Sequence, residues 1–463
     1  MEWKAMRRGR KLLSSYFDAQ YEYKHLRGII YIFLTIILVT ALTGCGSANT
    51  RQVLSKNSAE AVRQSHWIED IDYLQENLPK KHKNMYHSIK KEDFDKEIMS
   101  LKDEVPSLKD YEIKTRLAQI VASVGDAHTA LNLSSNNNLS YPVILYWFDK
   151  DLRIVSTNKD KKDILGKKLV KINNIPIDEI VKKIDTMISH ENNQWVKVMD
   201  VNYVTNPDVL KSLGITSKDT IQLSLEDDNN KITQVDLNPG TLNPDNAIRI
   251  IDEMQTKPIR LQFNNNFAET LYCYKYIPED KTLYFQYNQC IDYDVAKSYG
   301  FKNYEAYPKF DKFSEGLLKA IANNNVNKLV VDLRNNTGGD SRLMTSLVSK
   351  ISQIDKLKDK GKVFVIVGRE TFSSGVFAAI DFATQTNSIF YGEPTGGNVN
   401  GYGNVGALTL PNSKLQISYS MNFFELSDRF KDSFIPDKIV EESFDNYKKG
   451  IDDVYEAIKA YKN

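Results

Sequence analysis

Two adjacent hydroxyl groups, Ser373 and Ser374, stand in the stretch "RETFSSGVFAA", just before an apolar run that is typical of a helix. A serine at a helix start lies beside free backbone N–H groups, with the positive end of the helix dipole behind it. Such a serine can act as a nucleophile, and the N–H of Ser374 can bind an anion. The same position also suits an ordinary N-cap, so the pattern leaves both readings open.

A glycine pair supplies a second group of backbone donors. Gly338 and Gly339 follow "KLVVDLRNNT", whose apolar part predicts a buried strand. In open α/β sheets sites form where strands end, and glycine lets the main chain approach a ligand closely. Two backbone donors and a hydroxyl are the groups that form an oxyanion hole and a nucleophile for acyl transfer. The alternative is that the glycine pair only forms a turn, as glycine pairs after a strand more often do.

A serine hydroxyl needs a base at neutral pH, and His128 is the candidate among six histidines. It stands in "SVGDAHTAL", after an apolar helix face, and a purely structural histidine is the alternative. The other five lie before the apolar N-terminal run, in a loop, or in polar helical stretches where a surface position is expected: His25, His66, His82, His87 and His190.

The N-terminal 45 residues have the pattern of an export signal. The 14-residue apolar run from Ile29 to Leu42 is short for a membrane span and fits the core of a secretory signal. It ends in "LTGC", which resembles the bacterial lipobox and implies lipid attachment at Cys45. We therefore expect an extracytoplasmic protein held to the bacterial cell membrane by lipid, with residues 46–57 as a tether. A short membrane anchor with an incidental cysteine is the alternative.

Composition limits the remaining classes. A chain of 463 residues predicts two to three domains, and 61 basic against 60 acidic residues gives no basic excess for binding nucleic acid. Cys273 and Cys290 either pair or are buried free thiols, and no cysteine–histidine cluster suggests zinc. We expect no metal and no organic cofactor.

The periodicity of the chain predicts three units. Apolar residues three and four apart predict a helical bundle over 58–130, which carries His128. Short β-prone runs over 131–257 predict a small β-rich domain, either PDZ-like or of another kind. From 258 to 463, strands and helices alternate, with "SIFYGE" and "LQISYS" as late strands. The expected fold class is multi-domain α/β, with a mainly parallel, helix-covered sheet.

Four motifs in order resemble the C-terminal-processing and tricorn-like serine peptidases: "VGDAHTAL", "KLVVDLRNNTGG", "ETFSSGVFAA" and "YGEPTGG". They fall between about Trp67 and Val440. The resemblance implies a core of the ClpP/crotonase type, Ser373 as nucleophile, and an oxyanion hole from Ser374 and Gly339, with Gly338 as the alternative. It implies His128 as base, because Asn398 stands where the lysine-using branch has its lysine.

The chain departs from that family at the group that orients the histidine. Ala127 replaces a helper serine, and Phe430 stands where many relatives have a glutamate. Three acidic residues lie nearby, Glu425, Asp428 and Asp432, and we favour Glu425 for this role. An imidazole without an orienting partner still catalyses, but poorly.

The resemblance therefore implies a serine peptidase that cleaves polypeptides, of the tail-specific or tricorn-like kind. The rival from another class is a non-catalytic lipoprotein that keeps the fold and binds a ligand or peptide. The presence of both Ser373 and His128 favours the peptidase.

Overall fold

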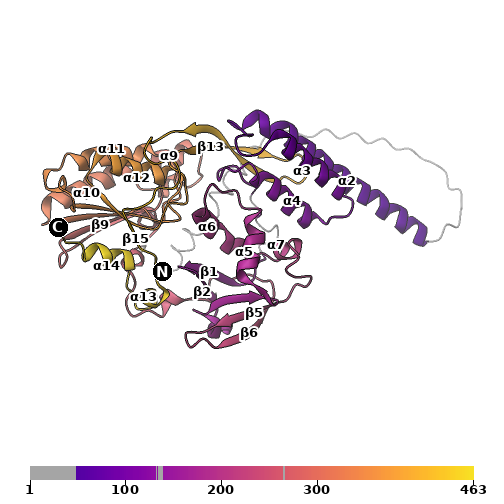
Figure 1. The fold of residues 1–463 in the computed structure, drawn as a ribbon, viewed down its shortest axis with the longest axis horizontal. Helices are drawn as coiled ribbons and strands as arrows, with labels where there is room; N and C mark the ends of the chain where they lie inside the picture. Colours follow the sequence, from indigo (N-terminus) through magenta and orange to yellow (C-terminus); the bar gives the residue numbers. More distant parts are fainter. Residues whose placement is uncertain (1–47, 132, 134–138, 264–265, 463) are drawn as a thin grey trace.

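The computed structural model describes residues 48–131, 133, 139–263 and 266–462, and its ribbon has three connected units (Figure 1). The predicted signal segment, with Cys45, lies outside the described residues. No helix within the described part of the chain has the length and apolar character to cross a membrane.

The first unit consists of three helices: α2 (Ala48–Lys81), α3 (Lys91–Glu104) and α4 (Asp110–Ala122). Leucine and isoleucine side chains spaced three or four apart, such as Ile71, Leu74 and Leu78, are fully buried between them. The segment 46–57 is predicted as a tether, and from Ala48 onward its chain is the first part of α2.

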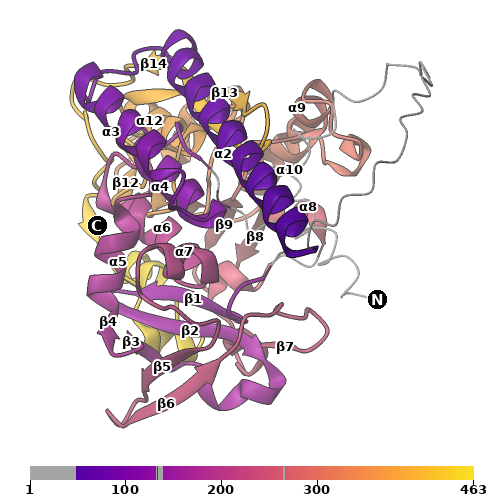
Figure 2. The same ribbon diagram turned by 90° about the vertical axis from the view of Figure 1, so that its right-hand side faces the viewer.

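The second unit is a seven-stranded sheet with helices against it (Figure 2). Its main path is β1-β2-β3-β5-β6, all antiparallel, with β4 and β7 paired to β3 and β2. Positive φ angles at Asn173 and Asn174 form the tight turn predicted from "KINNIPI". Its strands and helices are β1 (Val143–Phe148), β2 (Asp151–Asn158), β3 (Lys168–Ile172), β4 (Ile175–Pro176), β5 (Ile221–Glu226), β6 (Ile232–Leu237), β7 (Ala247–Arg249), α5 (Ile177–Asp185), α6 (Asn193–Tyr203) and α7 (Pro207–Ser212).

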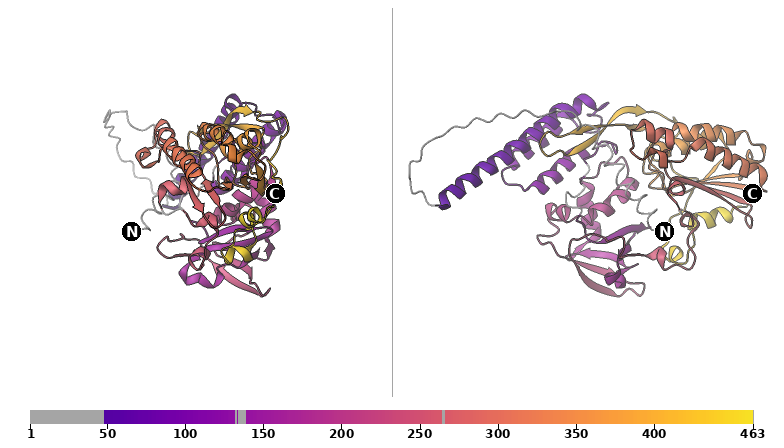
Figure 3. Two further views of the ribbon diagram at one scale, coloured as in Figure 1. Left: turned by 90° about the vertical axis from the view of Figure 1, so that its left-hand side faces the viewer. Right: turned by 180° about the vertical axis from the view of Figure 1, so that it is seen from behind.

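The third unit is built on a six-stranded sheet of order β15-β12-β11-β10-β9-β8, parallel except for the edge strand β8. Alternate side chains of its strands pack on helices α10, α11 and α12 on one face and on α14 on the other (Figure 3). The strands are β8 (Tyr272–Ile277), β9 (Thr282–Tyr287), β10 (Lys328–Asp332), β11 (Val363–Val367), β12 (Ile389–Gly392) and β15 (Lys438–Ile439). The helices are α8 (Phe267–Leu271), α9 (Tyr293–Ser298), α10 (Phe310–Asn323), α11 (Arg342–Ser352), α12 (Ser374–Gln385), α13 (Phe444–Lys448) and α14 (Asp453–Lys459).

A long hairpin, β13 (Gly401–Thr409) and β14 (Gln416–Phe424), leaves the third unit and reaches the first (Figure 1). Leu410 and Ile417 are fully buried in the same core as the N-terminal helices. The run "LQISYS" is therefore a strand as predicted, but it pairs with β13 and with Leu131 rather than joining the parallel sheet. This hairpin brings the chain that follows Ser373 alongside the loop of His128.

Candidate active site

Ser373 occupies a strained turn between β11 and α12. Its φ is 50° and its ψ is −126°, a conformation that residues with a side chain seldom adopt. It stands at the N-cap position of α12, yet its side chain makes no capping hydrogen bond. The hydroxyl is thus held at a helix start without being used to cap the helix, which separates it from the ordinary N-cap reading.

The hydroxyl of the neighbouring Ser374 is used in a hydrogen bond. Its hydroxyl donates a hydrogen bond of 2.6 Å to the carbonyl oxygen of Gly339, so it ties the helix start to the glycine loop after β10. If Gly338 carried a Cβ, this atom would lie 2.7 Å from Cβ of Ser373 and 3.0 Å from the backbone nitrogen of Ser374. The two strand ends predicted to form one site are therefore in direct contact.

The backbone donors differ between the two glycines. The N–H of Gly338 donates to Oδ1 of Asn336 at 2.9 Å and is already used. Within the described residues, neither the N–H of Gly339 nor that of Ser374 has a protein acceptor. Gly339 and Ser374 are therefore the pair with free donors, and Gly338 is less suited to the oxyanion hole.

Asn336 holds this arrangement in place from inside the fold. It is fully buried, its Nδ2 donates to the carbonyl of Tyr287 at 2.9 Å, and its own carbonyl accepts the N–H of Phe372. Sγ of Cys290 donates to Oδ1 of Asn336 at 3.3 Å. The side chain of Asn336 thus connects the end of β9 to the glycine loop, and its backbone carbonyl holds the turn that bears Ser373.

The ring of His128 lies against the residue next to Ser373. It stacks on Phe372 with 4.4 Å between ring centroids, and Phe372 stacks in turn on Trp195 of α6 at 4.0 Å. Both ring nitrogens of His128 are buried, and neither has a hydrogen-bond partner in the part of the chain that is described. His128 is therefore brought to the site, but no hydrogen bond joins it to Ser373.

Asp126 shapes the loop of His128 without orienting its ring. Its Oδ1 accepts the backbone N–H of His128 at 2.9 Å, whereas it lies 3.9 Å from Nδ1 of the ring. Its Oδ2 accepts hydrogen bonds from Thr129 and from Nε2 of His82. Burial alone would raise the pKa of Asp126, but the hydrogen bond from His82 and the charge of His128 oppose this and lower it to about 2.

The expected surface position of His82 is wrong. Its side chain is completely buried against Asp126, with Nε2 at 3.1 Å from Oδ2. The N–H of Asn84 donates to Nδ1 of His82, so the hydrogen-bond pattern assigns the ring proton to Nε2. Its polar neighbours in the sequence gave no indication of this long-range contact.

Burial lowers the pKa of His128 below its ordinary 6.5 because it disfavours the charged ring; the charge of Asp126 and the backbone of Tyr402 oppose this. The imidazole is therefore neutral at pH 7, which is the form that can accept a proton.

The acid favoured to orient this ring is not in contact with it. Glu425 follows β14 and is exposed, and no hydrogen bond or ion pair between described residues joins it to His128. Its role stays a prediction. Asn398 accepts a hydrogen bond from Nδ2 of Asn192 at 3.0 Å, so the two side chains form an amide pair. Sequence reasoning missed the segment from Glu191 to Trp195, which reaches the site only through tertiary contacts.

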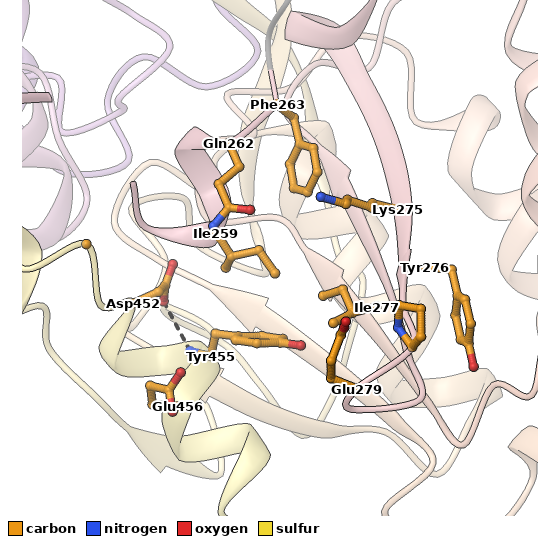
Figure 4. A pocket seen from close by; sticks show the side chains of 12 residues that line it. Ile259, Gln262, Phe263, Lys275, Tyr276, Ile277, Glu279, Asp452, Tyr455 and Glu456 are labelled. Atoms are coloured by element: carbon orange, nitrogen blue, oxygen red, sulfur yellow. Dashed lines mark hydrogen bonds between the residues drawn. The ribbon is translucent and has the colours of Figure 1, made fainter. Parts of the chain in front are cut away.

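Other possible sites lie elsewhere or are absent. Cys273 and Cys290 are both buried free thiols, which settles the alternative left open by the sequence. Within the described residues no group of acidic, histidine or cysteine side chains could hold a metal ion. A pocket of about 370 Å³ is lined by residues of β8 and α14 and by Phe263, and it contains none of the candidate site residues (Figure 4).

Comparison with known proteins identifies the fold. No family model matches the chain, and no curated protein does. Mature CPAF complexed with lactacystin matches with a TM-score of 0.58 at 10% identity, covering 86% of this chain and 97% of that one. A mutant of CPAF gives 0.59 at 10% identity, with 87% and 99% covered. The tricorn protease gives a TM-score of 0.43 at 12% identity, with 86% of this chain and 36% of that one covered. The predicted multi-domain α/β class is confirmed, and the chain shares its fold with CPAF over nearly the whole of both chains.

Proposed function

We propose that this chain is a serine peptidase that cleaves polypeptides through an acyl-enzyme, with Ser373 as nucleophile and His128 as general base. The observation that carries the proposal is the turn at Ser373. There Ser373 has a strained backbone and a hydroxyl that does not cap α12, and the backbone N–H groups of Ser374 and Gly339 beside it have no acceptor among the described residues. The fold shared with CPAF and the ordered motifs support it, and the neutral form of buried His128 suits a base.

In the proposed reaction, Oγ of Ser373 forms a bond with the peptide carbonyl carbon while His128 takes the hydroxyl proton. The N–H groups of Ser374 and Gly339 donate to the oxygen that gains negative charge. His128 then gives its proton to the leaving amine as the C–N bond breaks. A water molecule, deprotonated by the same ring, releases the acyl group and regenerates Ser373. The His128 ring and the Ser373 hydroxyl must come within hydrogen-bond distance before the first step, because no hydrogen bond joins these two residues in the structure.

Labelling of the full chain with a serine-reactive fluorophosphonate tests this proposal. We expect the wild type to label and both Ser373→Ala and His128→Ala to lose labelling, with all three folded by circular dichroism. A folded wild type that does not label would favour the rival, a non-catalytic protein that binds a ligand or peptide in the same fold.

We further propose that lipid at Cys45 anchors the protein outside the cytoplasm. The proposal rests on the sequence "LTGC" after an apolar run, in a segment outside the described residues. Growth of an expressing bacterium with an alkyne-bearing fatty acid should label the wild type, and Cys45→Ala should abolish that label. Labelling that persists in Cys45→Ala would contradict the anchor.

A further inference from the structure

Glu191 is a carboxyl group at the candidate site for which the mechanism above has no use. It lies in the loop between α5 and α6 of the β-rich unit, whereas His128 follows α4 and Ser373 follows β11. Its largely buried side chain lies against the backbone N–H groups of Ala127 and Asn398. One residue therefore contacts both the loop that carries His128 and the loop that follows β12.

The glycines of β13 show where this carboxyl lies relative to the imidazole. A Cβ on Gly401 would lie 3.3 Å from Oε1 of Glu191, and a Cβ on Gly403 would lie 3.8 Å from Cε1 of His128. Residues 401 and 403 face the same side of a strand and are about 7 Å apart. The carboxyl group and the ring therefore lie against the same face of β13, at neighbouring positions of that face.

Asn192, the next residue, joins this segment to the loop after β12 through hydrogen bonds. Its Nδ2 donates to the carbonyl of Gly396 at 2.8 Å and to Oδ1 of Asn398 at 3.0 Å. Its Oδ1 accepts the N–H of Trp195 and so caps the start of α6. The position of Glu191 is thus fixed by a docked helix start and does not depend on a free loop.

The titratable groups that face Glu191 belong to the loop of His128. Asp126 is the nearby charge, and Asp126 in turn accepts a hydrogen bond from His82. Burial raises the pKa of Glu191 to about 8, and the negative charge of Asp126 acts in the same direction. Glu191 is therefore neutral at pH 7 and becomes charged as the pH rises past 8.

We propose that Glu191 is a positioning residue that clamps the His128 loop to residues 396–398 and sets the electrostatic field at the imidazole. Its catalytic consequence rests on the proposed function, whereas the clamp itself does not. Ionised Glu191 would place a negative charge at the face of β13 that His128 also contacts, and this charge favours the imidazolium that forms when Ser373 loses its proton. Through this clamp, the position of His128 also depends on the docking of α6.

The first test is the pH dependence of fluorophosphonate labelling in the full chain. We expect the wild-type rate to rise through an acid limb due to His128 and then by about tenfold through a second limb near pH 8. Glu191→Gln keeps the size of the side chain but cannot ionise, so it should show the first limb alone. Glu179→Gln, at an exposed glutamate of α5, is the matched control and should behave as the wild type.

The second test needs no activity and separates this inference from the proposed function. A carboxyl whose pKa is raised on folding loses stability as the pH rises from its unfolded value through its folded value. Glu191→Gln should therefore gain melting temperature relative to the wild type between pH 5 and 9, while Glu179→Gln should not.

Each outcome decides one of the two ideas. If neither wild type nor Glu191→Gln labels, the proposed function fails and the melting comparison alone judges the clamp. If Glu191→Gln matches the wild type in melting temperature at every pH, the buried, titrating Glu191 is refuted. A wild type that labels with the same two limbs as Glu191→Gln would overturn the electrostatic role.

Discussion

Replacing Gly339 by alanine should disable the candidate oxyanion hole while leaving Ser373 and His128 intact. The added Cβ would lie 2.2 Å from the carbonyl oxygen of Cys290 and 2.8 Å from its carbonyl carbon, and both are backbone atoms that no rotamer change can move. The glycine loop must therefore shift by about 1 Å, and a misplacement of that size costs on the order of 100-fold in rate. Complete loss of one oxyanion donor costs about 100- to 1,000-fold.

The shift would also strain two backbone hydrogen bonds that hold this loop. The N–H of Cys290 donates to the carbonyl oxygen of Gly338 at 2.9 Å, and the N–H of Asp340 donates to the carbonyl oxygen of Cys290 at 2.7 Å. Each such bond contributes about 1 kcal/mol, so we expect Gly339→Ala to lose about 2 kcal/mol of stability as well.

The assay is the second-order rate constant of fluorophosphonate labelling, and Ser373→Ala, which lacks the proposed nucleophile, gives the background rate. Gly214→Ala is the matched control, because Gly214 also has a positive φ of 68° but no atom within 4 Å of an added Cβ. We expect Gly339→Ala to label about 100-fold more slowly and Gly214→Ala to label like the wild type. A folded Gly339→Ala that labels within threefold of the wild type would refute the assignment of this donor.

Three further outcomes are expected. Ser374→Ala should still label with fluorophosphonate but melt at a lower temperature, because it loses only a hydrogen bond to Gly339 worth about 1 kcal/mol; loss of labelling would move the nucleophile to Ser374. The acid midpoint of wild-type labelling should lie below pH 6.5, because burial lowers the pKa of His128 and keeps the ring neutral; a midpoint above 6.5 would contradict that burial. Folding lowers the pKa of Asp126 from 3.8 to about 2, which adds about 2 kcal/mol to the free energy of unfolding. This contribution is present above pH 3.8 and is lost as the pH falls toward 2. Urea unfolding should show this acid loss in the wild type, and an equal loss in Asp126→Asn would contradict it.

The two strand ends of the site could be predicted because their signals are local. The buried runs before Gly338 and Ser373 are short, apolar and followed by turn or helix-start residues, and the structure has β10 and β11 there. In a parallel sheet such strand ends meet at one edge, so contact between the glycine loop and the serine turn follows from the topology.

Contacts between distant segments left no such local signal. His82 is flanked by lysines, yet Asp126 of another segment buries it. Glu191 stands among polar residues that are typical of a surface loop, and only the docking of α6 brings it to the site. The chain is helical from Ala48 although its composition there is typical of a linker, because composition gives only a weak preference that the rest of the structure can outweigh.

The β13–β14 hairpin also determines when the site can exist during synthesis. Backbone bonds join Ala130 to Ser418, and these two residues are 288 positions apart in the chain. The N-terminal helices leave the ribosome first, but their core stays open until Leu410 and Ile417 arrive to close it. A nascent chain therefore carries His128 for most of its synthesis without a partner serine. The peptidase activity proposed above therefore requires nearly the whole chain to be made and folded before other proteins can be cut.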